Sequence, residues 1–354
     1  MSNIYTKINV RSPYMLSQAG SAANQPVQLD LYLHNGGGSE PASASYTLSK
    51  VTTTASLLTV YFDISPYLKS YISHTSLTPV TGLTATAGST MCYCKAVLKL
   101  SGVVQSTTYL VGYDGYGYFA NGMNPALDLN IMLDEGEYYM YKNQNYGALF
   151  YYQDSDITSP AVDWDAKYVC LDGTTADVDI DLNTQDNGHI PYITPTHKNN
   201  GGSTLKIFKD SSLYKTFTFT EVCETKYTPV VCDFVNKYGV FQTIIFFKVS
   251  KSKINIIDNK YKMMPSTPNY NTSKNINQRF NINGQESITV NTGFVREGYS
   301  DVMQQILLSE IIRLDGKPVI PNTKSLDMHK SINERLINYS LTFDYANNII
   351  NTIQ

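Results

Sequence analysis

The sequence is poor in charged residues, in tryptophan and in cysteine. Of its 354 residues, 16% are charged and one is Trp, whereas Tyr alone contributes 28 residues. An average soluble protein has roughly 25% charged residues, and coiled coils or helix bundles need large amounts of Ala, Glu, Lys and Leu. These helical classes are therefore disfavoured. Because Tyr and Thr suit a half-buried pleated surface and Asn and Gly suit turns, the composition favours a mainly-β fold with long polar loops.

Cysteine is too scarce and too scattered to form a disulfide framework. Cys92 and Cys94 have C-x-C spacing, without a second pair or a neighbouring His, and this is not the pattern of a zinc site. We expect all the thiols to be small core residues of a protein that assembles in a reducing cytosol. There are five cysteines, an odd number: Cys92, Cys94, Cys170, Cys223 and Cys232.

Long apolar runs are also missing. No stretch approaches the roughly 18 apolar residues of a membrane-spanning helix, and the N-terminus MSNIYTKINVRSPY lacks a basic region followed by an apolar core. We therefore expect a soluble protein with no export signal and no membrane partner.

Enzyme motifs are absent as well. The sequence has no H-E-x-x-H, no G-x-S-x-G, no Walker lysine loop and no kinase signature. Gly115 and Gly117 begin a G-x-G, but the next glycine is Gly122, which is the wrong spacing for a dinucleotide-binding loop. We therefore expect no enzymatic activity, no cofactor, and no catalytic, cofactor-binding or metal-binding residue. The histidines are too far apart in the sequence for any two of them to have metal-binding spacing. They are His34, His74, His189, His197 and His329.

Charge is distributed unevenly along the chain. Residues 1–200 contain 9 Lys and Arg against 17 Asp and Glu, whereas residues 201–354 contain 18 against 13. Two surfaces of opposite sign attract each other, which favours head-to-tail contacts between copies or a contact with a charged neighbour. A drift in surface composition without functional meaning is the alternative. No concentrated basic stripe is present, so we expect no nucleic-acid partner.

Alternating apolar and polar residues predict strands in both halves. Val27, Leu29, Leu31 and Leu33 alternate with polar residues up to His34, the period of a half-buried strand. Hairpin turns are predicted at Ser101-Gly102, Asp210-Ser211-Ser212 and Asp315-Gly316. Residues 250–285, rich in Lys, Asn, Ser and Pro, are expected to form a long surface excursion.

Two short helices are predicted. Residues 66–73 have apolar side chains at helical spacing, with Ser65 as the expected N-cap and Pro66 in the first turn. Residues 300–310 have the same spacing, with Asp301 placed favourably in the first turn. The prediction is a mainly-β protein of two β-sandwich-like domains with long loops and one or two short helices: an acidic domain at 1–190, a linker at 191–204 and a basic domain at 205–354.

Acidic residues cluster between residues 154 and 186. In one strand, Asp177, Asp179 and Asp181 would project from the same face about 7 Å apart. A solvated or interfacial strand face is one interpretation, and a Ca²⁺ site is another, because Ca²⁺ binds six to eight oxygen ligands. A third hypothesis is a glycoside hydrolase that uses two of these carboxylates, although no pair is specified.

A glycine-rich stretch at 112–122 carries several tyrosines. Tyr113, Tyr116 and Tyr118 would stack on sugar rings if they were exposed, or pack within a sheet or a subunit contact if they were buried.

The first half contains the β-rich segments NVRSPY (9–14), LDLYLHNGG (29–37), YTLSK (46–50) and TVYFDISPYLKSYI (59–72). The second half contains CETKYTPVVCDFVNKYG (223–239), IIFFK (244–248), ITVNTGFV (288–295), LLSE (307–310) and INERLINYSLTFDYA (332–346). Together these segments resemble virion structural proteins of tailed bacteriophages, of the kind found in phages of Bacteroidota.

This resemblance implies a tail, baseplate, collar or ring protein that is present in multiple copies. The expected partners are the protein itself, as a homo-oligomer or ring, and other phage tail or neck proteins, and the expected location is the virion, after assembly in the host cytoplasm. The resemblance transfers no catalytic residue. The alternative function is a glycan-binding or host-recognition module of the tail.

Overall fold

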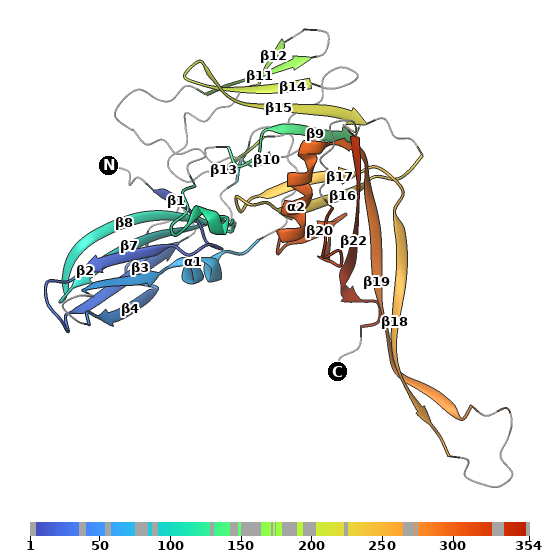
Figure 1. Ribbon diagram of the computed structural model, residues 1–354, viewed down its shortest axis with the longest axis horizontal. Helices are drawn as coiled ribbons and strands as arrows, with labels where there is room; N and C mark the ends of the chain where they lie inside the picture. The colour runs from blue at the N-terminus through green and yellow to red at the C-terminus, as the bar shows by residue number, and fades with distance from the viewer. Residues whose placement is uncertain are drawn as a thin grey trace. The chain divides into compact units, whose positions relative to one another are not determined.

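A computed structural model gives the fold of the chain (Figure 1). It describes residues 5–34, 40–53, 58–74, 84–86, 91–127, 131–141, 148–149, 164–170, 173, 175–178, 190–193, 203–222, 226–264, 273, 275–327 and 336–351. Of this part of the chain, 59% is in strands and 9% is helical. The predicted mainly-β fold with few, short helices is therefore confirmed.

The chain divides into two compact units. Unit 1 comprises Met1–Cys223 and Phe234–Ile244, and unit 2 comprises Glu224–Asp233 and Ile245–Gln354. Strands β16 (Val230–Val235) and β17 (Phe241–Phe246) each contribute residues to both units.

The first part of unit 1 is a two-layer β-structure. A five-stranded sheet has the order β1-β8-β7-β3-β4, and a two-stranded sheet pairs β2 with β5. Apolar residues of β3, β7 and β8 form one buried cluster with Val60 and Phe62 of β5 and with Leu68 of helix α1. The β2–β5 pair and α1 therefore cover one face of the sheet. The elements are β1 (Thr6–Asn9), β2 (Met15–Ala19), β3 (Pro26–His34), β4 (Tyr46–Val51), β5 (Thr59–Asp63), α1 (Ser65–Tyr71), β7 (Met91–Leu100) and β8 (Val103–Tyr113).

Strand β3 shows the predicted alternation, with one exception. Val27, Leu29 and Leu31 are fully buried, but Asp30 on the opposite face is only 3% exposed. Its carboxylate accepts hydrogen bonds from Lys99 Nζ at 2.7 Å and from Thr47 Oγ1 at 2.8 Å. A buried charge of this kind is tolerated because it is paired.

A second five-stranded sheet of unit 1 has the order β12-β11-β14-β15-β9. Its β14–β15 hairpin turns at Asp210 and Ser211, which have φ values of 49° and 63°. Two consecutive positive φ values are typical of a type I′ hairpin turn. The predicted turns at Ser101-Gly102 and Asp315-Gly316 also have two consecutive positive φ values. The strands are β9 (Gly136–Tyr141), β11 (Trp164–Cys170), β12 (Thr175–Val178), β14 (Ser203–Lys209) and β15 (Ser212–Val222).

Shorter elements complete unit 1. A 3₁₀ turn, η1 (Phe119–Asn121), follows β8. Strands β6 (Thr84–Thr86), β13 (Ile190–Ile193) and β10 (Ala148–Leu149) are neighbours in one sheet, and β10 also pairs with β17 through Gln242.

Unit 2 contains an antiparallel sheet with the order β18-β19-β22-β21-β20. Its elements are β18 (Lys251–Lys262), β19 (Asn277–Arg296), the 3₁₀ turn η2 (Glu297–Tyr299), α2 (Ser300–Leu308), β20 (Ile312–Leu314), β21 (Lys317–Pro321) and β22 (Leu336–Asn348). Helix α2 confirms the helix predicted at 300–310, and it ends two residues earlier, at Leu308.

The helix predicted at 66–73 is also confirmed, but Ser65 is not its N-cap. The N-cap is Ile64, and Ser65 is the first helical residue. The Ser65 hydroxyl instead donates to the Ser12 carbonyl at 2.7 Å and accepts from the Tyr14 backbone N–H at 2.8 Å. This serine therefore ties the N-terminal segment to the helix.

The predicted linker at 191–204 falls mostly outside the described residues. Its first residues belong to β13, which pairs with β6 and β10, and its last residues belong to β14. The β14–β15 hairpin pairs with β11 and β9, so residues 203–222 join a sheet of unit 1. The predicted boundary between domains at 1–190 and 205–354 stays a prediction.

Candidate interaction surface

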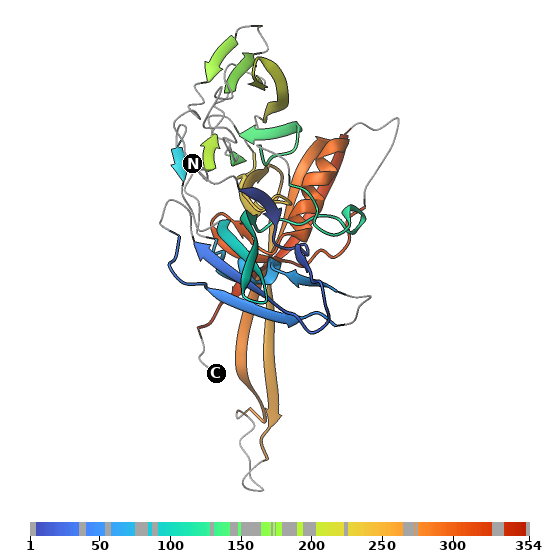
Figure 2. The ribbon, with the colours of Figure 1, turned by 90° about the vertical axis from the view of Figure 1, so that its left-hand side faces the viewer.

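A two-stranded arm projects from the sheet of unit 2. We define the arm as β18 together with residues 277–286 of β19. Strand β19 pairs with β22 from Gln285 onward, whereas residues 277–283 pair only with β18 among the described strands. In Figures 1 and 2 the far ends of β18 and β19 run side by side beyond the end of β22. An isolated two-stranded ribbon is marginally stable in water, so such an arm gains stability from a partner.

One face of the arm carries exposed isoleucines. Ile254 and Ile256 are 59% and 61% exposed, and Ile256 lies directly opposite Gly284 in the strand pair. A Cβ atom on Gly284 would lie 3.0 Å from Ile349 Cδ1 and 3.4 Å from Ile254 Cγ2. Gly284 therefore leaves room for these side chains to form a continuous apolar stripe, which we define as Ile254, Ile256 and Ile349.

The segment after β22 is fixed beside the stripe by hydrogen bonds. The Ile349 N–H donates to the Gly284 carbonyl at 2.8 Å. The Asn283 amide accepts from the Ile350 N–H and donates to the Ile350 carbonyl, both at 3.1 Å. The position of Ile349 is therefore set before any partner binds.

The arm is also basic. The arm contains Lys251, Lys253, Lys260, Lys262 and Arg279 against Asp258 and Glu286. Arg279 forms an ion pair with Asp258. The four lysines of β18 lie at exposed positions, where their charge can attract a negative surface.

A second exposed apolar feature is the turn at 118–123 in unit 1. Tyr118 is 48% exposed and Phe119 is completely exposed at the start of η1. The turn is ordered because Asn121 Oδ1 accepts from the Tyr118 N–H at 2.8 Å and Asn124 bonds both backbone groups of Met15. The sequence prediction placed Tyr113, Tyr116 and Tyr118 together as stacking candidates.

The structure separates these three tyrosines. Tyr113 is fully buried, which rules it out as a platform for a sugar ring. Tyr116 is half-buried, and the Arg11 guanidinium carbon lies 5.0 Å from the centre of its ring. The ring also packs edge-on against Tyr118, with the two ring centres 6.0 Å apart. Tyr118 is the most exposed of the three.

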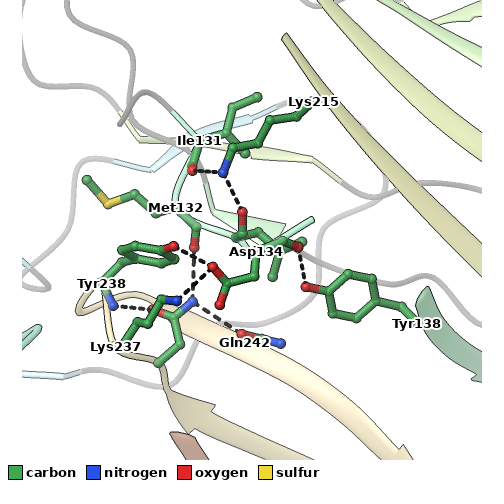
Figure 3. Close-up of polar contacts among 10 residues, drawn as sticks. Ile131, Met132, Asp134, Tyr138, Lys215, Lys237, Tyr238 and Gln242 are labelled. Atoms are coloured by element: carbon green, nitrogen blue, oxygen red, sulfur yellow. Dashed lines mark hydrogen bonds and ion pairs between the residues drawn. The ribbon is translucent and has the colours of Figure 1, made fainter. Parts of the chain in front are cut away.

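Also in unit 1, a partly buried polar network surrounds Asp134 (Figure 3). The Asp134 carboxylate pairs with Lys237 Nζ at 2.8 Å and accepts a hydrogen bond from the Tyr238 hydroxyl. Burial and the adjacent carboxylate raise the pKa of Tyr238, so its hydroxyl keeps the proton that it donates. The Tyr138 hydroxyl donates to the Asp134 carbonyl at 2.6 Å.

The same network satisfies the backbone of residues 131–133, which form no regular strand. Buried Lys215 Nζ donates to the carbonyls of Ile131 and Leu133 at 3.1 and 2.8 Å, and Asn236 Nδ2 donates to the Met132 carbonyl at 2.9 Å. Burial lowers the pKa of Lys215. These contacts hold an irregular segment in place, so we interpret the network as structural.

His74 and Asp114 form a second buried polar pair. His74 Nε2 lies 2.8 Å from Asp114 Oδ2, and the two side chains are 5% and 7% exposed. The His74 ring packs edge-on against Phe241 at 5.6 Å. The pair connects the segment after α1 with the glycine-rich loop after β8.

The structure describes only some of the acidic residues and cysteines that the sequence analysis named. Asp177 lies in β12 and pairs with Lys167 in the backbone register, whereas Asp179 and Asp181 lie outside the described residues. The calcium and glycosidase hypotheses and the acidic strand face therefore stay untested. Cys92, Cys94 and Cys232 are buried free thiols, which confirms their expected core role, and Cys170 and Cys223 lie where no side chain is described.

Sequence analysis missed the apolar stripe, although a local signal was present. Lys253-Ile254-Asn255-Ile256 alternates polar and apolar residues within a stretch that is otherwise dominated by Lys and Asn. The composition of the stretch concealed this short β-pattern.

Where side chains are described, no group of three or more His, Cys, Asp or Glu could hold a metal ion. In the same part of the chain, no helix has the length and apolarity required to span a membrane.

The chain was also compared with known proteins. No protein-family model matches the sequence, and no curated protein matches it significantly.

Proposed function

We propose that this chain is a non-enzymatic structural component of a phage virion, in the tail, baseplate, collar or ring. In this proposal it assembles as multiple copies and also contacts other tail or neck proteins. It is made in the host cytoplasm and acts in the assembled particle. The proposal starts from the sequence resemblance and is supported by a fold built from several sheets with an exposed arm.

The observation that carries the proposal is the exposed apolar stripe on the arm. Each fully buried isoleucine stabilises a contact by about 1.5–3 kcal/mol, and a single copy leaves the three isoleucines of the stripe largely in water. Contiguous exposed apolar surface on a soluble protein is typical of an interaction site. An assembly that buries this surface is the simplest reason for the arm.

A non-enzymatic role agrees with the way several ionisable groups of unit 1 are used. Asp134 and Lys237 form an ion pair, and Lys215 is bonded to backbone carbonyls, so these groups are engaged in holding loops. Neither the sequence nor the geometry of the described residues nominates a reacting group.

The composition of purified particles tests the proposed location. Phage particles from infected cells are purified on a density gradient and digested, and peptides of this chain are counted against isotope-labelled standards. We expect several copies per particle, co-migrating with infectivity, with an abundant host cytosolic protein as the contamination control. Recovery of the chain solely in the unassembled fraction would contradict the proposal.

The second candidate function is a glycan-binding or host-recognition module of the tail. The specific observation in its favour is the ordered turn that exposes Tyr118 and Phe119, because aromatic faces can stack on sugar rings. A glycan array with the purified protein tests it, with Tyr118→Ala as the site variant and Tyr46→Ala, an exposed tyrosine of β4, as the control. Saturable binding that Tyr118→Ala alone abolishes would support this function, and absence of saturable binding would exclude it.

A further inference from the structure

We propose that the apolar stripe of the arm docks on the acidic first half of a second copy of this chain. This inference rests on the proposed self-assembly and names the surfaces that carry it. It assigns one face of the arm to the contact and leaves the opposite face in solvent.

The stripe is organised before binding. Its three isoleucines come from β18 and from the segment after β22, and that segment is fixed by backbone and Asn283 hydrogen bonds. A preformed surface loses less conformational entropy on association than a disordered one. Gly284 at the centre lets Ile254 and Ile349 approach each other, which makes the surface continuous.

Charge selects the partner. The arm carries five basic residues against two acidic ones, whereas residues 1–200 carry 9 basic against 17 acidic. Opposite charges favour docking of the arm on the first half of another copy. Two arms have the same sign, so a symmetric contact from arm to arm is repulsive.

The contact is therefore made between two different surfaces. A heterologous contact of this kind closes into a ring when the rotation between copies permits, and otherwise extends into a filament. Both outcomes place many identical copies in one assembly.

The face of β18 is a better docking surface than its edge. Lysines recur along β18 at Lys251, Lys253, Lys260 and Lys262, and the pairing with β19 is irregular between Ile257 and Asn259. Lysines and bulges on an edge strand discourage another strand from pairing with it. Side-chain packing on the stripe is accordingly the mode of contact that we propose.

Ile256 and Ile257 give a matched pair of variants. They are adjacent, they are 61% and 64% exposed, and they point to opposite faces because side chains alternate along a strand. Ile256→Asn removes an isoleucine from the stripe, and Ile257→Asn makes the same chemical change on the other face. Circular dichroism and thermal unfolding verify that both variants fold like the wild type.

Association of the full-length variants is measured by light scattering and sedimentation over a range of concentrations. We expect Ile256→Asn to weaken association at least about tenfold and Ile257→Asn to leave it within about twofold of wild type. Equal effects of the two substitutions, large or small, would overturn the assignment of the contact to the stripe.

Carbodiimide cross-linking identifies the partner surface, because it joins a lysine amine to a carboxylate in direct contact. A mixture of ¹⁴N- and ¹⁵N-labelled protein distinguishes links between copies from links within one copy. We expect mixed-isotope links from arm lysines to carboxylates in residues 1–200. Mixed-isotope links that join arm lysines to Asp258 or Glu286 would indicate a contact from arm to arm and overturn the proposed partner.

The two proposals fail in different ways. If wild-type protein associates but Ile256→Asn behaves like Ile257→Asn, the docking inference is wrong and self-assembly stands. If wild-type protein does not associate under any condition, self-assembly is wrong and the docking inference is wrong with it.

Discussion

Gly239 lies so close to Gly115 that a Cβ atom on Gly239 would come within 2.5 Å of the Gly115 backbone nitrogen. In the other direction, a Cβ on Gly115 would lie 2.5 Å from the Lys237 carbonyl oxygen. The Tyr116 N–H donates to that same carbonyl at 2.8 Å. The glycine-rich loop after β8 and the turn between β16 and β17 are therefore in direct backbone contact within unit 1.

This contact predicts a large cost for Gly115→Ala. The added methyl group meets backbone atoms that cannot move away independently, and overpacking of this kind costs about 1–3 kcal/mol. Urea unfolding monitored by tyrosine fluorescence measures the change. Gly298→Ala is the control, because a Cβ at that position meets nothing within 4 Å. Equal stability of the two variants would show that the loop does not depend on this close approach.

Lys215→Met is predicted to lower the free energy of unfolding by about 2 kcal/mol, because it leaves two buried carbonyls without their donor. Methionine keeps a similar length, so the loss reports on the hydrogen bonds more than on packing. The measurement is denaturant unfolding, and Lys324→Met at an exposed site controls for the loss of a lysine charge. If Lys215→Met were as stable as wild type, the Asp134 network would not be what holds residues 131–133.

Asp30 makes stability depend on pH. Burial alone would raise its pKa, but hydrogen bonds from Lys99, Gln28 and Thr47 lower the pKa below its usual value. A lowered folded-state pKa contributes stability above the unfolded pKa, near 4, and this contribution is lost as the pH falls through the folded pKa.

Asp30→Asn should therefore cost about 2 kcal/mol at neutral pH and show a weaker loss of stability in acid than wild type. Unfolding curves measured between about pH 7 and pH 3 test this. Asp327→Asn, at an exposed position, is the control for the loss of a carboxylate. An identical acid profile for Asp30→Asn and wild type would contradict the role given to Asp30.

The buried thiols are predicted to resist alkylation in the folded protein. Burial raises the pKa of Cys94 to about 12 and raises the pKa of Cys92 as well, so almost no reactive thiolate is present at neutral pH. Mass spectrometry after iodoacetamide treatment should find both unmodified in native protein and fully modified in urea. Rapid native labelling of Cys92 would show that β7 is not in the core.

Local patterns explain how much of the fold could be predicted from the sequence. The alternation in Val27–His34, the turn residues at Asp210-Ser211 and the helical spacing near Val302 each depend on neighbours in the chain, and the structure confirms each of them. Strand partners are not local. Nothing near β15 indicates that it runs parallel to β9, about eighty residues earlier.

The candidate surface was harder to predict for a related reason. Exposed isoleucines next to Lys and Asn look like part of an irregular polar excursion until β19 is known to pair with β18 and to extend beyond β22. The same limit applies to Tyr113, since burial depends on the whole sheet and not on the flanking glycines. Ser65 shows that a good local N-cap residue can be used by a distant segment instead.

The mass of the wild-type protein in solution shows whether copies of the chain assemble with one another. Light scattering behind a sizing column, across a range of concentration and salt, compares this mass with the 39.5 kDa of one chain. We expect a defined multiple of 39.5 kDa that dissociates as salt screens the contact between the basic arm and the acidic half. A mass of 39.5 kDa at every concentration and salt would contradict this expectation.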